Sequence, residues 1–197
     1  MLKGTNVVVF DCETVNPVDG FVITWNDHAK MGLSVACMYD FKTDDFSVHL
    51  EPDVPRMVER FKTADLVVAF NSKGFDNKLL RALGHDIDES NHWDMLEVSR
   101  RAAGWYDGQL FPKGLRLDDH LSAMFGAQNM KTTAGENAPL WWQEGRMSEV
   151  ISYCLADVKR ERDLFIHMMT YGWVETATHG RKFVDRSFAA KRIWGSK

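Results

Sequence analysis

The sequence is poor in cysteine and has no long apolar segment. Its three cysteines, Cys12, Cys37 and Cys154, show no Cys-x-x-Cys spacing, so neither a disulfide framework nor a zinc site is indicated. No apolar run approaches the roughly twenty residues that span a bilayer, and no signal-peptide pattern precedes the first expected strand. We therefore expect a soluble, cytoplasmic protein that does not associate with a membrane.

Internal repeats and low-complexity segments are also absent, which excludes repeat and solenoid architectures. The chain has 197 residues, of which 45% are hydrophobic. This length and composition can bury the core of one domain of ordinary size, and a second domain would not fit.

Two acidic residues follow a β-branched segment near the N-terminus. Val7 to Val9 favours a strand, and side chains of a strand alternate between its two faces. Asp11 and Glu13 therefore point the same way. Neighbouring carboxylates repel each other, so this arrangement favours a bound cation.

A third carboxylate follows a second apolar segment. Leu66 to Phe70 is typical of a buried strand, and after a short loop Asp76 lies near the start of an amphipathic helix with Leu79, Leu80 and Leu83. Functional carboxylates are often presented at such strand-to-helix junctions.

The fourth carboxylate lies in a long segment with helical periodicity. Tyr153 and Asp157 are four residues apart, so they share one face of this helix. The apolar residues that recur at spacings near three and four are Val150, Ile151, Leu155, Val158, Leu164 and Phe165.

Four carboxylates could supply the oxygen shell of two hard divalent cations held about 3.5–4 Å apart. Tyr153 would then orient the attacking water or help to deprotonate it. Each motif alone is common as a purely structural feature, but their occurrence together in suitable local structure favours a two-metal site. The predicted ligands are Asp11, Glu13, Asp76 and Asp157.

Three segments resemble the exonuclease motifs of the DEDD superfamily of 3′–5′ exonucleases. They are Phe10 to Thr14, Asn71 to Asp76 and Tyr153 to Asp157. Because of its tyrosine, the third motif resembles that of the tyrosine subgroup of this superfamily. Ser152 occupies the position at which the histidine subgroup has histidine. The middle motif is similar to that of the proofreading domain of family B DNA polymerases and its stand-alone relatives. The resemblance covers about Thr5 to Tyr171.

The resemblance implies an α/β fold of the ribonuclease H-like type and hydrolytic removal of nucleotides from a 3′ end with two Mg²⁺ or Mn²⁺ ions. Asp11, Glu13, Asp76, Tyr153 and Asp157 would be the catalytic residues. We also expect contacts to substrate from Thr14, Asn71, Lys73, Phe75 and Lys131. For Asn71, shaping the loop is an equally supported role.

Single-stranded or frayed DNA is the favoured substrate, and a helicase or a polymerase is a candidate partner. Two alternatives remain: trimming of RNA, because the metal chemistry ignores the sugar, and a weakly active module that binds nucleic acid or a protein partner. The formal net charge of −4 does not oppose a polyanionic substrate, because bound cations would offset the four metal ligands.

The hydrophobic pattern predicts a mixed sheet, with an antiparallel meander plus parallel strands and helices on both faces. Strands are expected at Asn6 to Phe10, Leu33 to Tyr39, Phe46 to Leu50, Leu66 to Phe70 and His92 to Trp93. Helices are expected at Pro55 to Thr63, Phe75 to Leu83, Met95 to Ala103, Leu117 to Phe125 and Met147 to Met169.

Two long segments and the C-terminus lie outside this pattern. Asn16 to Lys30 and Gln128 to Gly145 are expected to be irregular and to lie near the site, where their aromatic residues could stack on unpaired bases. Residues 1–171 would form the exonuclease domain, and residues 172–197 a basic extension packed on it. The extension has six basic and two acidic residues, which is compatible with tracking phosphates or with a solvated helix face.

Overall fold

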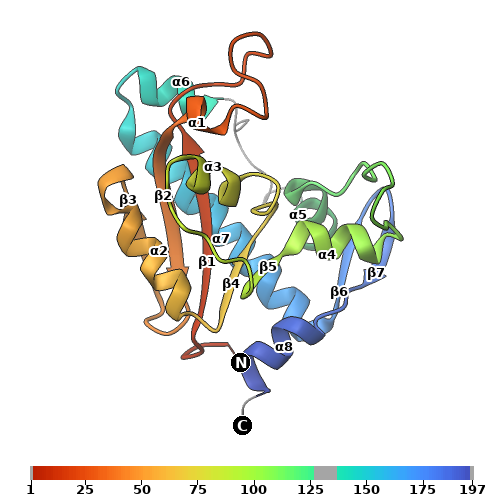
Figure 1. Ribbon diagram of the computed structural model, residues 1–197. Coiled ribbons are helices and arrows are strands. Elements are labelled where there is room, and N and C mark those ends of the chain that lie inside the picture. Colours follow the sequence, from red (N-terminus) through yellow and green to blue (C-terminus); the bar gives the residue numbers. More distant parts are fainter. Residues whose placement is uncertain (1, 127–136, 196–197) are drawn as a thin grey trace.

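A five-stranded mixed sheet forms the centre of the protein (Figure 1), as the computed structural model of residues 2–126 and 137–195 shows. The strand order is β3-β2-β1-β4-β5. β1 pairs antiparallel with β2, and β2 pairs antiparallel with β3, which confirms the expected meander. β1 pairs parallel with β4, and β4 with β5. The bounds are β1 Val7–Thr14, β2 Leu33–Asp40, β3 Asp45–His49, β4 Leu66–Ala69 and β5 His92–Asp94.

Helices cover both faces of this sheet, as the sequence predicts. Figure 1 shows α2 and α3 on one side and the long helix α7 on the other. Near these helices lie α4, α5 and the short 3-10 helix η1. The bounds are η1 Glu51–Asp53, α2 Val54–Thr63, α3 Asp76–Ala82, α4 Met95–Ala102, α5 Leu117–Phe125 and α7 Met147–Tyr171.

Alternation along β1 divides the buried side chains into two cores. Val8, Phe10 and Cys12 pack with α2 and α3, whereas Val7 and Val9 pack with α7. Asp11 and Glu13 continue the second set, so by the same alternation they belong to the α7 face.

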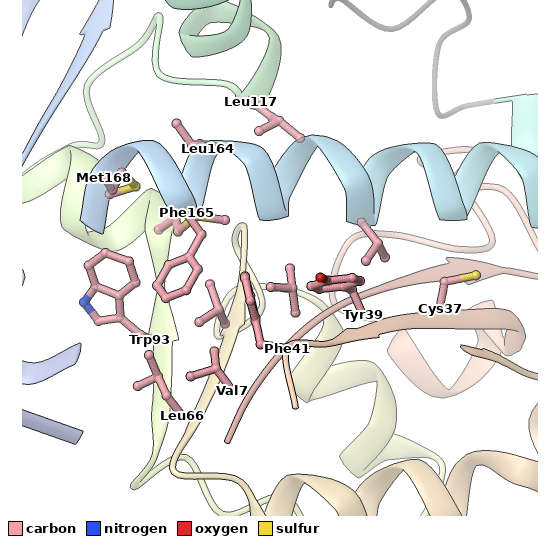
Figure 2. Close-up of a cluster of buried hydrophobic side chains, with 14 of the residues drawn as sticks. Val7, Cys37, Tyr39, Phe41, Leu66, Trp93, Leu117, Leu164, Phe165 and Met168 are labelled. Carbon is pink, nitrogen blue, oxygen red and sulfur yellow. The ribbon is translucent and has the colours of Figure 1, made fainter. Parts of the chain in front are cut away.

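The core under α7 is built around aromatic side chains (Figure 2). Phe165 is fully buried and points from α7 toward Trp93 and Phe41. The ring centroid of Phe165 lies 5.6 Å from that of Trp93 and 5.8 Å from that of Phe41. This packing fixes the position of the helix that carries Tyr153 and Asp157.

The structure corrects several expected boundaries. β1 continues to Thr14 instead of ending at Phe10, so both acidic residues lie within the strand. The segments expected to be irregular contain short helices, α1 at His28–Met31 and α6 at Ala138–Gln143. Helices of four and six residues are too short to give a clear periodic pattern.

The C-terminal residues form elements that the hydrophobic pattern did not predict. They are the hairpin β6–β7 and helix α8, with bounds Trp173–Thr176, Gly180–Phe183 and Ser187–Trp194. Val174, Val184 and Ala189 are buried in the same core as α7. Every helix in the described part of the chain is too short or too polar to cross a bilayer.

Candidate metal centre

The two carboxylates of β1 lie beyond the point at which the pairing of β1 with β4 ends. Asp11 and Glu13 are half-buried, and they pair through the backbone with Cys37 and Val35 of β2. On the other side, the register with β4 ends at Val9. Beyond Val9, this edge of the sheet is open to residues from other elements.

Helix α7 contacts β1 at this point through Cys154. Its Sγ lies 3.4 Å from the main-chain oxygen of Asp11 and 3.7 Å from Asp11 Oδ2. Ligand atoms of Asp11, Glu13 and Cys154 all lie within 4.8 Å of one another. Burial, the neighbouring Cys37 and the charge of Asp11 raise the pKa of the Cys154 thiol well above its usual value, so the thiol is protonated at neutral pH. Cys154 lies in an apolar run of the sequence, which favours packing over a place in a metal site.

The same helix presents both residues of the third motif. Tyr153 and Asp157 are buried, and the ring of Tyr153 meets that of Trp141 of α6 edge-on, with centroids 6.1 Å apart. Asp157 Oδ1 accepts a hydrogen bond from Arg160 Nη1 at 2.9 Å. Sequence reasoning missed this ion pair, although the spacing of three residues on one helix permits it.

Asp76 approaches β1 from the start of α3. Its Oδ1 accepts a hydrogen bond from the main-chain N–H of Cys12 at 3.1 Å, and the residue is 3% exposed. Burial raises the pKa of the Asp76 carboxyl to about 7, and the charge of Asp94 adds to this effect. The buried carboxyl is therefore partly protonated at neutral pH, and a nearby cation would favour its ionised form.

The loop before Asp76 is held by Asp94, which also caps α4. The Asp94 carboxylate accepts hydrogen bonds from the main-chain N–H groups of Asn71 and Lys73 at 2.9 and 3.1 Å, and from that of Leu96 at 2.9 Å. Asn71 has a φ of 71°. A Cβ added to Gly74 would lie 2.4 Å from Asn71 Oδ1, so a larger residue at position 74 would require the Asn71 side chain to move. The main-chain oxygen of Asn71 accepts hydrogen bonds from the N–H groups of Gly74 and Phe75 at 3.0 and 2.9 Å.

The remaining predicted substrate contacts lie in different surroundings. Lys73 Nζ pairs with Glu97 of α4 at 2.8 Å. Thr14 is buried and its hydroxyl donates to the main-chain oxygen of Asn16 at 3.2 Å. Phe75 packs against Trp25, with ring centroids 6.1 Å apart. Lys131 lies outside the described residues.

Two further contacts, not predicted, position the elements around the carboxylates. Gln143 of α6 donates from Nε2 to the main-chain oxygen of Val15, just after β1, at 3.2 Å. Glu161 of α7 is buried and accepts from the main-chain N–H of Phe70, just after β4, at 3.2 Å. Both join residues distant in sequence, so no local pattern reveals them.

Comparison with known proteins agrees with this architecture. The family model of the RNase H superfamily matches residues 8–169. This chain belongs to the RNase H superfamily. The match confirms the expected ribonuclease H-like fold and supports nuclease activity. A search of curated proteins found no match.

Among solved structures, this RNase H superfamily member is similar to the family B DNA polymerase of the hyperthermophilic archaeon Pyrobaculum calidifontis. The TM-score is 0.57 at 15% sequence identity. The similarity covers 83% of this chain but 24% of the polymerase chain. At this identity the comparison concerns the fold, and it agrees with the resemblance of the three motifs.

Nucleases of the RNase H type use divalent metal ions, and the residues of this site fit such ions. Carboxylate oxygens are the ligands that Mg²⁺ and Mn²⁺ prefer. Asp11 and Glu13 place such oxygens within the same small cluster, and burial of Asp76 raises the pKa of its carboxyl and so disfavours its ionised form. A bound cation would supply that compensation.

Proposed function

We propose that this member of the RNase H superfamily is a metal-dependent 3′–5′ exonuclease of the tyrosine-type DEDD group, acting on single-stranded or frayed DNA ends. One observation carries the proposal: the contact of Cys154 with Asp11 sets the helix bearing Tyr153 and Asp157 against the strand bearing Asp11 and Glu13.

In this proposal, two Mg²⁺ or Mn²⁺ ions are held by Asp11, Glu13, Asp76 and Asp157. When bound, these ions lower the pKa of water and stabilise the charge that develops on the phosphate. The hydroxyl of Tyr153 orients the attacking water by a hydrogen bond. The buried position of Tyr153 and its contact with Trp141 hold that hydroxyl in place.

The direction of digestion and the preference for DNA rest on the resemblance of the motifs to proofreading exonuclease domains. Residues 1–171 form the exonuclease domain in this proposal, and the basic residues 172–197 are an extension of it. A helicase or a polymerase is the partner class that would deliver a single-stranded or frayed 3′ end.

The test is digestion of 3′-labelled and 5′-labelled single-stranded DNA and RNA of the same sequence, in Mn²⁺, Mg²⁺ or EDTA. We expect a metal-dependent ladder that shortens from the 3′ end of DNA. Asp11→Asn should lose activity by orders of magnitude while remaining folded. Asp45→Asn, which changes an exposed carboxylate of β3, is the matched control and should retain activity.

Each other outcome has a defined meaning. Equal or faster digestion of RNA would make the protein an exoribonuclease. Shortening from the 5′ end would refute the direction. Absence of cleavage of either polymer, with retained binding, would favour a binding module. Full activity of purified Asp11→Asn protein would refute the assignment of the site.

A further inference from the structure

A nearly buried ion pair includes one of the proposed metal ligands. Arg160 Nη1 lies 2.9 Å from Asp157 Oδ1, and the side chains are 19% and 4% exposed. Such a pair contributes little net stability, because the cost of desolvating both charges offsets their attraction. The pair also places a positive charge on a carboxylate that the proposed metal ions require.

Arg160 also lines two neighbouring cavities along α7. One cavity, of about 370 Å³, is lined by Trp141, Ser152 and Tyr153. The second, of about 390 Å³, is lined by Leu121, Phe125 and Ile166. Both volumes fall in the range of sites for small organic groups, and each cavity has an aromatic ring on which a base could stack.

In a nucleic-acid strand, one phosphodiester lies between each two neighbouring bases. A cation located between two base-sized cavities is therefore suited to bind the phosphate that joins the two nucleotides. Arginine fits this role because its planar guanidinium can donate two parallel hydrogen bonds to one phosphate.

We propose that Arg160 exchanges partners, pairing with Asp157 in the metal-free protein and with the last phosphodiester of the substrate strand when metal ions are bound. This inference rests on the proposed function. Metal ions bound to the oxygens of Asp157 would compete with Arg160 for that carboxylate and would place positive charge beside the guanidinium. A substrate phosphate then becomes its favoured anion, so metal binding and substrate binding strengthen each other.

The test measures binding of a labelled single-stranded DNA by fluorescence anisotropy, with Ca²⁺ or with EDTA, at several KCl concentrations. In Ca²⁺, Arg160→Gln should weaken binding about tenfold or more, as expected for a hydrogen bond between charged groups. The slope of log Kd against log[KCl] should fall in magnitude by about 0.7, the value for one phosphate of a single strand. In EDTA, wild type and Arg160→Gln should bind equally.

Arg162→Gln is the matched control on the same helix. Arg162 pairs with Asp163 at 2.8 Å, and its guanidinium carbon lies 4.8 Å from the ring centroid of Tyr39. This substitution should leave the salt slope unchanged. Arg160→Lys should restore the slope and only part of the affinity, because lysine keeps the charge but not the planar fork.

Asp157→Asn tests the exchange directly, because asparagine keeps the shape of the side chain but lacks the negative charge that pairs with Arg160. In EDTA, this variant should bind DNA about tenfold more tightly than wild type, because the carboxylate no longer competes for Arg160. The double variant Asp157→Asn/Arg160→Gln should lose that gain. An equal loss of affinity from Arg160→Gln in EDTA and in Ca²⁺, or an unchanged salt slope, would refute the exchange.

Turnover with Mn²⁺ separates this inference from the proposed function. If wild type digests DNA while Arg160→Gln shows the wild-type KM and salt slope, only the inference fails. If wild type neither digests nor binds nucleic acid, the proposed function fails and the inference falls with it.

Discussion

Asp76→Asn should remove a large pH dependence from the stability of the metal-free protein. Asp76 is nearly inaccessible to water, and asparagine has the same shape and keeps the oxygen that accepts from Cys12 N–H. The substitution therefore tests the cost of the buried charge while preserving the packing.

The sign and size of the effect follow from the pKa of the carboxyl. Burial raises it from 3.8 to about 7, so between these values the folded protein holds a proton that the unfolded chain has lost. This contribution to stability is fully present below pH 4 and is lost as the pH rises through 7. Each pH unit corresponds to about 1.4 kcal/mol. Wild type should thus lose about 3 kcal/mol between pH 5 and pH 8 from this group.

Urea denaturation in EDTA at pH 5, 6, 7 and 8 measures this effect. Other groups have the opposite effect on stability. Burial lowers the pKa of His92 to about 4, so the folded protein favours neutral histidine and this residue increases stability as the pH rises. The difference between wild type and Asp76→Asn cancels such contributions, and the variant should be the more stable protein at pH 8. Mn²⁺ should then stabilise wild type more than the variant. Parallel stability curves for the two proteins would refute the reasoning.

Three other substitutions test separate parts of the structure. Tyr153→Phe should lower kcat about a hundredfold, the scale of lost proton-transfer assistance, with unchanged Mn²⁺ affinity in calorimetry; an unchanged kcat would exclude the role of the hydroxyl. Phe165→Ala should lower the free energy of unfolding by about 3–5 kcal/mol in urea, because it empties a fully buried site under α7; a loss below 1 kcal/mol would contradict the packing. Arg60→Gln should cost about 2 kcal/mol at pH 7, because Arg60 forms two hydrogen bonds with Asp40. Burial raises the pKa of Asp40, but the Arg60 contacts lower it overall, so the loss should shrink as the pH falls toward 3.

Local periodicity explains why the central elements could be predicted. The alternation of Val7, Val9 and Asp11 along β1 repeats every two residues, and the face shared by Tyr153 and Asp157 repeats every helical turn. Both patterns depend on neighbours along the chain. Apolar residues also recur often enough on one face of β1 and of α7 to indicate which face is buried.

The hydrophobic pattern did not predict the elements that are short or largely exposed. Helix α1 has four residues and α6 has six, which is too little sequence for a helical pattern. Strand β7 is largely exposed and includes Arg181 and Lys182, so it lacks the apolar alternation typical of a half-buried strand.

The sequence by itself determined the sheet order of the meander, the long helix and the faces on which the acidic residues lie. The reason is that, in a strand or a helix, the spacing between two residues sets the directions in which their side chains point. Only the tertiary structure decided the surroundings of those residues. The pKa of Asp76 depends on burial and on Asp94, 18 residues away, and the contact between Cys154 and Asp11 joins residues 143 positions apart in the chain. The spacing of three residues permits the pairing of Arg160 with Asp157, but only the structure shows that the pair forms and that the carboxylate side chain is 4% exposed. Electrostatic properties of a site depend on all charges and solvent around it, and these are set by packing between distant segments.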